Sequence, residues 1–290
     1  MPRALLGVLR PHQWLKNLLL FVPIIMAHRW SDGAALRMTF IAALAFCCIA
    51  SAGYVINDLV DVRFDRQHPT KRNRAFASGA LSPAMGWAIV PVLLAAAGVL
   101  AWSVGTTFVL WCVLYIAMTT LYSLVLKRKV MIDVLTLAGL YMIRILAGGA
   151  ASRVEVSTWL LGFAMFLFLS LALLKRYVDL DLAAAAGANG AFGRAYLVEE
   201  RDLLRSIGLP SGLLAVLVLA LYLTSDQVTR LYRTPRLLWL ACPLLLFWIA
   251  HMWFLAARGK VHDDPIVAAA QDPSSYVVGV LIALVGFLAV

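Results

Sequence analysis

Three aspartates in one short stretch have the spacing of a metal-binding set. Asp58, Asp61 and Asp65 stand at positions i, i+3 and i+7, which share one face of a helix with about 3.6 residues per turn. Carboxylate oxygens are the ligands that Mg²⁺ prefers, and bound Mg²⁺ keeps positions open for substrate phosphate. The spacing therefore predicts a Mg²⁺ site. The alternative is an acidic face neutralised by ordinary surface pairs with Arg63 and Arg66.

A run of basic residues follows within nine positions of Asp65. Its members are Arg66, Lys71, Arg72 and Arg74, and Asn57 adds a polar side chain immediately before Asp58. Cations beside a metal can neutralise the oxygens of a diphosphate leaving group. Pro69 ends the preceding helix, so we expect the basic residues to fold back over the acids. The combination favours chemistry in which diphosphate departs from a donor.

A second polar group follows a long apolar stretch. Lys175 and Arg176 stand a few residues before Asp179 and Asp181. The two cations suit phosphate groups, and the acids suit a metal. The alternative is a Lys/Arg pair that only places its charges at the membrane surface.

Three further polar features lie in or beside apolar stretches. Asp133 follows Lys127-Arg128-Lys129 by one helical turn; both a role toward a metal or substrate hydroxyls and a structural ion pair with these lysines stay open. Arg144 lies inside an apolar stretch, where an arginine is a functional candidate, but the adjacent Gly148-Gly149 favours a structural role. The stretch 194–202 is interpreted as a solvated connection, with a lid as the alternative.

The composition shows which elements must position these residues. The chain has 290 residues, of which 63% are hydrophobic and 14% charged, against about 45–50% and 25% in soluble domains. Several apolar stretches reach the ~20 residues of a spanning helix, and the alternating pattern of a membrane barrel is missing. We therefore predict an all-α polytopic membrane bundle that forms one domain over residues 1–290.

Apolar stretches and charged breaks give nine predicted spans. They are 13–30, 36–57, 84–103, 106–126, 131–150, 157–175, 211–224, 237–256 and 274–290. Of the 25 Lys and Arg, 18 fall on the side of the N-terminus, six on the opposite side, and Arg144 within a span. The positive-inside rule then predicts a cytoplasmic N-terminus in the plasma membrane. The connections 58–83, 127–130, 176–210 and 257–273 hold nearly all the acids, so the site should face the cytoplasm.

The net charge and the cysteines exclude other classes of function. The charge of +10 follows mostly from this topology, with attraction to anionic lipid or phosphate as a second use, and no nucleic-acid partner is expected. The four cysteines have no metal-binding spacing and are interpreted as small buried apolar residues. No cleavable leader precedes the first span, so the mature protein is expected to start near Met1.

The motif around Asp58 resembles a known family. N-D-L-V-D-V-R-F-D, followed by R-Q-H-P-T-K-R-N-R and A-S-G, looks like the first aspartate-rich signature of the UbiA superfamily of intramembrane transferases. The stretches Leu9–Asn17, Tyr122–Arg128 and Tyr141–Ala150 extend the resemblance, which covers about residues 8–180 well. One departure is Ala75, where related sequences often carry proline.

This resemblance implies a set of functional residues. Catalytic and metal-binding roles fall on Asp58, Asp61 and Asp65, with Mg²⁺ as cofactor, and Asp179 is also implied as catalytic. Substrate-binding roles fall on Asn57, Arg66, Lys71, Arg72, Arg74, Lys127, Asp133, Tyr141, Lys175, Arg176 and Lys16.

The second polar group guides the choice of substrates. The order K-R-Y followed by an acid is similar to the branch of decaprenyl-phosphate phosphoribosyltransferases, which implies phosphoribosyl diphosphate as donor and a polyprenyl phosphate as acceptor. The alternative is transfer of a prenyl group from prenyl diphosphate to an aromatic or other small acceptor. A transporter is disfavoured because no inverted repeat is evident. Membrane lipids are expected neighbours, and a homo-oligomer stays open.

Overall fold

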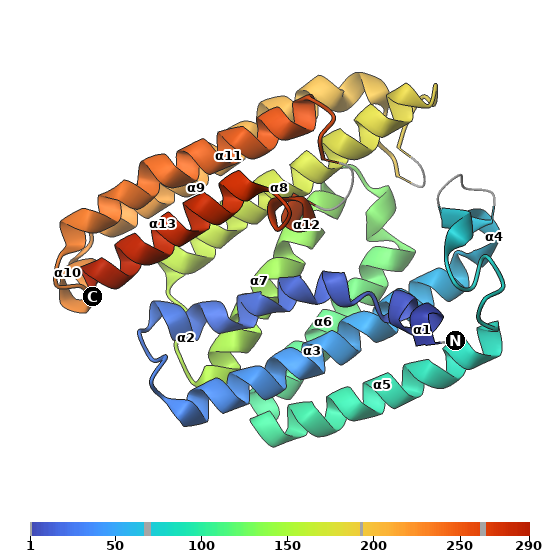
Figure 1. Ribbon diagram of the computed structural model, residues 1–290, viewed down its shortest axis with the longest axis horizontal. Coiled ribbons are helices and arrows are strands. Elements are labelled where there is room, and N and C mark those ends of the chain that lie inside the picture. The colour runs from blue at the N-terminus through green and yellow to red at the C-terminus, as the bar shows by residue number, and fades with distance from the viewer. Residues whose placement is uncertain (1, 67–70, 192–193, 262–264) are drawn as a thin grey trace. The chain divides into compact units, whose positions relative to one another are not determined.

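A computed structural model of the chain describes residues 2–66, 71–191, 194–261 and 265–290 (Figure 1). The side chains of residues 2–4, Phe64 and Lys71 lie outside this description, as does Pro69, which was expected to end a helix. The described residues form helices and contain no strand beyond an isolated bridge between Gly190 and Leu197. The predicted all-α class is therefore confirmed.

The chain divides into two compact units, Met1–Leu124 with Ile143–Val156, and Val125–Met142 with Ser157–Val290. We describe each unit by itself. The interpretation of residues 1–290 as one domain stays a prediction.

The first unit is built around one long apolar helix. Its elements are α1 (Pro2–Leu9), the 3-10 helix η1 (Pro11–Phe21), α2 (Val22–Met26), α3 (Gly33–Val60), α4 (Val62–Asp65), η2 (Lys71–Asn73), α5 (Pro83–Val104), α6 (Thr106–Leu124) and the second half of α7 (Ile132–Ser152). Asp32 and Ser82 start α3 and α5 by accepting hydrogen bonds from the N–H groups of Ala35 and Met85. Helix α5 runs along α3, as Figure 1 shows, and η1 also packs on α3.

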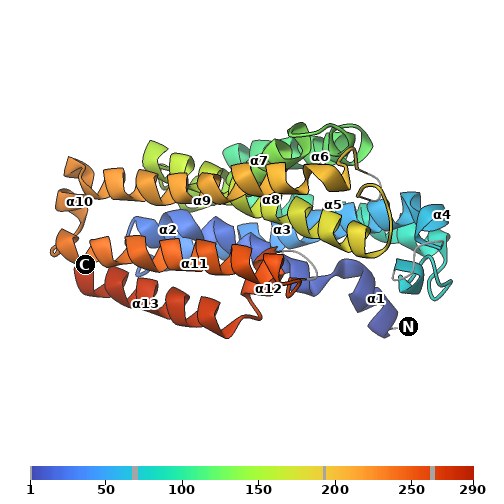
Figure 2. The same cartoon turned by 90° about the horizontal axis from the view of Figure 1, so that it is seen from above.

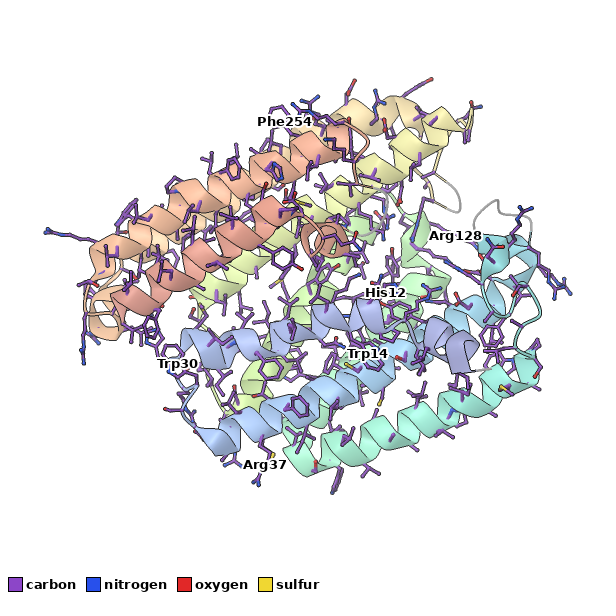
Figure 3. All side chains as sticks on the ribbon, viewed as in Figure 1. His12, Trp14, Trp30, Arg37, Arg128 and Phe254 are labelled. Atoms are coloured by element: carbon purple, nitrogen blue, oxygen red, sulfur yellow. The ribbon has the colours of Figure 1, made fainter. Side chains whose placement is uncertain are left out.

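Glycine permits the closest approach in the first unit. A Cβ atom on Gly148 would lie 2.1 Å from the carbonyl oxygen of Leu20, so η1 reaches this part of α7 only because the side chain is absent. A Cβ atom on Gly149 would likewise lie 2.8 Å from the carbonyl oxygen of Val154. Both glycines therefore lie where a side chain would collide with neighbouring backbone. The exposed Arg37 points away from α3 (Figure 3).

The second unit pairs its helices along their lengths. Its elements are η3 (Leu126–Arg128), the first half of α7, α8 (Thr158–Ala185), η4 (Val198–Glu200), α9 (Arg201–Leu223), α10 (Asp226–Leu231), η5 (Pro235–Leu240), α11 (Ala241–Ala257), α12 (Pro265–Ala269) and α13 (Pro273–Ala289). Helices α8 and α9 pack along each other, and α11 lies against α9 and α13 (Figure 2). Gly208 and Gly212 admit the side chains of Trp253 and Ile249.

The predicted spans agree roughly with the observed helices. Among the described residues, seven helical stretches are long and apolar enough to cross a membrane, and the shorter α13 is also apolar. The first predicted span is formed by η1 followed by α2 rather than by one α-helix. The chain is thus an integral membrane protein, while its orientation and the identity of the membrane stay predictions.

Two predicted boundaries in the second unit are wrong. Helix α8 continues to Ala185, and α9 begins at Arg201, so the connection predicted as 176–210 is reduced to 186–200. The charged ends stay helical because their charges are paired. Asp181 of α8 accepts from Arg201 of α9 at 2.9 Å, and the Arg201 guanidinium lies 5.9 Å from the ring centroid of Tyr177.

Candidate active site

The N-terminal segment is fastened to α3 next to the aspartate motif. Trp14 of η1, labelled in Figure 3, donates from Nε1 to the Ser51 hydroxyl at 3.1 Å. The Ser51 hydroxyl donates in turn to the carbonyl oxygen of Leu9 at 2.9 Å. Arg10, which lies between Leu9 and Trp14 in the sequence, has a left-handed backbone conformation with φ 50°. Such a conformation costs a non-glycine residue about 1–3 kcal/mol, and these anchors hold it.

Two of the three predicted aspartates converge on one arginine. Asp58, at the end of α3, and Asp65, on α4, are both buried. Arg74 Nη1 lies 3.1 Å from Asp58 Oδ1 and 2.8 Å from Asp65 Oδ2. Arg10 Nη2 lies 2.5 Å from Asp58 Oδ1, and its guanidinium lies 5.0 Å from the ring centroid of Tyr54. The carboxylate oxygens and the cations therefore meet at one point, which we call the carboxylate cluster (Arg10, Asp58, Asp65 and Arg74).

The third aspartate stands at a break in the helix. Asp61 is the C-cap of α3 with φ −88° and ψ 2°, so the expected continuous helix is interrupted before α4. Its half-buried carboxylate forms no ion pair with any described residue. Asp61 is thus the one member of the predicted set whose charge lacks a partner in the described part of the chain.

The other residues predicted at this site have less specific surroundings. Asn57 and Lys16 are half-buried on α3 and η1, and Arg72 is exposed. Arg66 is exposed and donates to the carbonyl oxygen of Ala77 at 3.2 Å. The side chain of Lys71 lies outside the described residues. Arg74 therefore supplies the expected fold-back of the basic segment, and Arg10 is a cation that sequence reasoning did not assign to the site.

The donor atoms of the carboxylate cluster suit a hard divalent cation. Asp58 and Asp65 already direct carboxylate oxygens at one cationic nitrogen, and oxygen is the ligand that Mg²⁺ prefers. The described residues contain no ready-made group of three metal-binding side chains. The fit therefore lies in the type of donor and in the shared direction of the Asp58 and Asp65 carboxylates, and a metal-binding role for Asp61 stays a prediction.

A second cluster of charges is buried in the other unit. Arg176 of α8 lies with Nε 2.6 Å from Asp133 Oδ2, and its Nη1 donates to Asp179. Tyr196 donates its hydroxyl hydrogen to the other carboxylate oxygen of Asp133. Arg176, Asp133 and Tyr196 are each at most 1% exposed. We call these four residues the tyrosine cluster.

The tyrosine cluster changes two expectations. Asp133 was given either a ligand role or an ion pair with the neighbouring lysines, and its observed partners are Arg176 and Tyr196. Arg176 was expected to bind phosphate, yet its guanidinium is buried between two carboxylates. The observed contacts of Arg176 are thus to carboxylates, and its phosphate-binding role stays a prediction.

In the connection before α9, the Tyr196 side chain is buried against other residues rather than exposed to solvent. The Tyr196 hydroxyl accepts from the backbone N–H of Met131 at 2.9 Å, and Arg194 donates to the carbonyl oxygen of Lys127 at 3.3 Å. A Cβ atom on Gly190 would lie 2.6 Å from the Tyr196 carbonyl oxygen, which explains a glycine there. Burial raises the pKa of Tyr196, and its hydrogen bond to Asp133 raises that pKa further. The interpretation of this stretch as a solvated connection is wrong at Tyr196.

Three other predicted residues lie near these elements. Lys175 is half-buried on α8, one residue before Arg176, and Lys127 is half-buried in η3. Tyr141 of α7 stacks on Phe168 with 4.7 Å between ring centroids. These contacts neither establish nor contradict a substrate-binding role.

Arg144 forms a polar network inside the first unit. Its Nε donates to Asn17 Oδ1 at 3.1 Å, and its Nη2 donates to the Tyr115 hydroxyl at 2.6 Å. Asn17 in turn donates to the Cys47 sulfur at 3.2 Å. The guanidinium is buried and lies 4.8 Å from the ring centroid of Tyr115. These contacts tie η1, α3, α6 and α7 together, which agrees with the structural role favoured by the sequence.

The described helices and buried ion pairs define an integral membrane protein with two clusters of charged residues. Residues 18–266 match the model of the UbiA prenyltransferase family, so the chain belongs to this family and is a transferase. A solved structure of a UbiA homolog from Archaeoglobus fulgidus, bound to GPP and Mg²⁺, superposes with a TM-score of 0.73 over 99% of each chain at 19% identity. At that identity the likeness shows the fold.

The chain is also similar in sequence to other proteins. The uncharacterized protein y4nM of Sinorhizobium fredii is 38% identical over 96% of this chain, which spans 54% of that relative's length. Decaprenyl-phosphate phosphoribosyltransferase of Mycolicibacterium smegmatis is 35% identical over 64% of this chain and 60% of its own length. The chain thus spans little more than half the length of these relatives.

Proposed function

We propose that the protein transfers a 5-phosphoribosyl group from phosphoribosyl diphosphate to a polyprenyl phosphate. The observation that carries the proposal is the convergence of Asp58 and Asp65 on Arg74 in a chain of the UbiA family. This point gathers the carboxylates needed for Mg²⁺ and the guanidinium groups needed for phosphate.

The proposed transfer breaks one bond and forms one bond. The bond between the anomeric carbon of the donor and its diphosphate oxygen breaks, and the electron pair leaves with the diphosphate. A phosphate oxygen of the acceptor then bonds to that carbon. Because the acceptor is already ionised, no strong general base is needed. This agrees with the carboxylate cluster, whose described members are aspartates and arginines without a histidine.

The chain's own residues would bind and orient the leaving group. Asp58, Asp61 and Asp65 would hold Mg²⁺, which when bound neutralises charge that develops on departing diphosphate. Arg10 and Arg74 would exchange their carboxylate contacts for phosphate oxygens when the donor arrives. Arg66 and Arg72, which are exposed on the same segment, add positive charge for the donor.

The choice of phosphoribosyl donor rests on the relatives and on Lys175. The similarity to decaprenyl-phosphate phosphoribosyltransferase supports this donor for the present chain. A phosphoribosyl diphosphate carries one phosphate more than a prenyl diphosphate, and Lys175 is the cation next to the tyrosine cluster that can bind it. We place this chemistry at the cytoplasmic face of the plasma membrane, where the 18 Lys and Arg of the N-terminal side are expected.

Prenyl transfer to an aromatic or other small acceptor is the second candidate. It is supported by the acids Asp179 and Asp181 on α8, whose carboxylates suit a metal. The fold likeness to a protein bound to GPP and Mg²⁺ is compatible with this alternative.

A donor screen decides between these candidates. Purified protein in lipid nanodiscs is supplied with Mg²⁺, polyprenyl phosphate and phosphoribosyl diphosphate labelled in the ribose. A parallel reaction contains labelled prenyl diphosphate with a set of aromatic acids. Label recovered in the lipid fraction of the first reaction supports the proposal. Prenylated aromatic product together with an unlabelled lipid phosphate supports the second candidate.

A further inference from the structure

The connection between α9 and α11 carries three exposed arginines with no assigned role. Arg230 lies at the end of α10, Arg233 follows it, and Arg236 lies at the start of η5. We call these three residues the arginine elbow. None of them forms an ion pair with a described residue, and the sequence has no acid between Asp226 and Asp263. Their positive charge is therefore left for a partner outside the described chain.

The backbone of the elbow is held in place by the rest of the second unit. The Thr234 N–H donates to the carbonyl oxygen of Ala289 at 3.1 Å, and the Thr234 hydroxyl donates to that of Leu288 at 3.1 Å. Val228 is buried in a small core that includes Leu223 and Leu238. Figure 1 accordingly shows α10 beside the C-terminal end of α13. The arginines thus project from a fixed turn rather than from a loose loop.

The elbow has an apolar rim that suits the membrane boundary. It connects two candidate membrane spans, Val198–Leu223 and Pro235–Ala257. Leu231, Leu237, Trp239 and Leu240 are exposed along it. Arginine and tryptophan beside exposed leucines are the residues of a surface that meets lipid headgroups and the adjoining acyl chains.

We propose that the arginine elbow is a binding site for anionic phospholipid headgroups. Guanidinium groups bind phosphate oxygens through paired, charge-assisted hydrogen bonds, and the neighbouring apolar side chains contact the acyl chains. Three arginines against one exposed acid, Asp226 at the start of α10, leave a net positive charge that favours an anionic lipid over a zwitterionic one.

The proposal is independent of the proposed transfer reaction. Arg201 begins α9, and the elbow follows the end of that helix. The 23 residues of α9 span roughly 35 Å at about 1.5 Å per residue. Asp181, which pairs with Arg201 at the start of α9, is therefore separated from the elbow by about the length of that helix, and the two proposals can fail separately.

The test compares nanodiscs of phosphatidylcholine alone with nanodiscs that also contain phosphatidylglycerol. The measurements are the thermal midpoint of unfolding and the number of phosphatidylglycerol molecules retained in native mass spectrometry. The wild-type chain should unfold at a higher temperature with phosphatidylglycerol and retain it preferentially. The triple variant R230Q/R233Q/R236Q should lose this preference, by about tenfold or more in relative retention.

The matched control removes the same charge elsewhere. R37Q/R205Q/K260Q changes three exposed cations outside the elbow and should keep the wild-type preference. If the triple elbow variant does not fold, the single variants should each show part of the loss. An unchanged lipid preference in the elbow variants overturns the proposal, and so does an equal loss in the control. Equal stabilisation of the wild-type chain by inorganic phosphate in neutral detergent also overturns it.

Discussion

Tyr196 and Asp133 are joined by a buried hydrogen bond across 63 positions of sequence. Asp133 uses its second carboxylate oxygen to bind Arg176, and the Tyr196 hydroxyl also accepts from the Met131 backbone. The connection 186–200 is thereby fixed to the start of α7 and, through Arg176, to α8. Tyr196, Asp133 and Arg176 depend on one another because all three are buried, where an unpaired polar group is costly.

The substitution Tyr196→Phe should destabilise the protein. It removes the donor to Asp133 and the acceptor for the Met131 N–H, and leaving buried groups unsatisfied costs about 1–3 kcal/mol each. Chemical denaturation in detergent, followed by tryptophan fluorescence, measures the loss. Tyr177→Phe is the matched control, since Tyr177 is buried and its ring contacts survive the change. Equal stability of the two variants would contradict the assigned role.

The stability of Tyr196→Phe should also depend on pH differently from the stability of the wild type. The raised pKa of Tyr196 means that the folded state holds the phenol proton more tightly than the unfolded state. Its contribution to stability is complete below the unfolded pKa of about 10 and decreases as pH rises above that value. Wild type should therefore lose more stability than Tyr196→Phe between neutral pH and about pH 11. Parallel pH profiles for the two proteins would count against a buried Tyr196 hydroxyl.

The sequence predicted local features well and distant contacts poorly. Asp58, Asp65 and the basic segment with Arg74 lie within one short stretch of sequence. The return of that segment to the aspartates could therefore be predicted. Arg10 reaches Asp58 across 48 positions, and no local pattern announces that contact. The signal that could have found it is the conjunction of Arg10 with Trp14, because an aromatic anchor fixes the segment that carries the arginine.

Helix ends were mispredicted where charges are paired in three dimensions. Hydropathy placed the end of the sixth span near Lys175, but α8 continues for ten more residues to Ala185. Polar residues end an apolar stretch without ending a helix when partners such as Arg176 and Asp133 neutralise each other. The burial of Tyr196 was missed for a different reason, since a tyrosine in a Gly-rich polar stretch gives no sign that its ring is buried.

Replacing Arg74 should make the protein depend on Mg²⁺. Arg74→Gln deprives Asp65 of its observed cation and leaves Asp58 with Arg10 alone. The variant should be less stable than wild type without metal, by about 1–3 kcal/mol, and should regain stability as Mg²⁺ takes the vacated position. Thermal unfolding over a Mg²⁺ titration measures both effects. Arg72→Gln, an exposed change on the same segment, should behave as wild type.

A Mg²⁺ response of the same size in wild type, Arg72→Gln and Arg74→Gln would show that guanidinium and metal do not share these carboxylates. The proposed metal site would then have to lie elsewhere.

Asp61 offers the cleanest test of the proposed Mg²⁺ site. Because its side chain has no ion-pair partner among the described residues, Asp61→Asn should change stability by less than about 0.5 kcal/mol. Mg²⁺-dependent turnover should nevertheless fall by two or more orders of magnitude if Asp61 is a metal ligand. Glu155→Gln, an exposed acid away from the cluster, is the control. Full activity of Asp61→Asn would remove Asp61 from the metal site.

Orientation in the membrane can be measured by labelling. In a chain whose four native cysteines are replaced, we introduce one cysteine at the exposed position of Arg72 or of Glu155. An impermeant maleimide added to intact cells should label position 155 but not 72, because the 18 to 6 distribution of Lys and Arg places the basic segment in the cytoplasm. Labelling at position 72 from outside would reverse the topology and deny the site a cytosolic donor.

The donor can be tested by separating the neighbours Lys175 and Arg176. Arg176 binds Asp133 and Asp179, so Arg176→Gln leaves a buried carboxylate without its cation and should cost about 3–5 kcal/mol of stability. Lys175 is half-buried beside it and is proposed to bind a donor phosphate. Lys175→Gln should therefore keep its fold and raise the KM for phosphoribosyl diphosphate.

The size of this effect follows from the contact that is lost. A hydrogen bond to a charged group contributes about 1.5–3 kcal/mol, which corresponds to a KM increase of roughly 10- to 150-fold. The kcat at saturating donor should change little, because the contact is made in both the bound and the reacting states. Lys175→Arg retains the charge and should recover most of the affinity. If Lys175→Gln leaves the KM for phosphoribosyl diphosphate unchanged, Lys175 does not bind the donor, and the case for a phosphoribosyl donor rests on the sequence relatives alone.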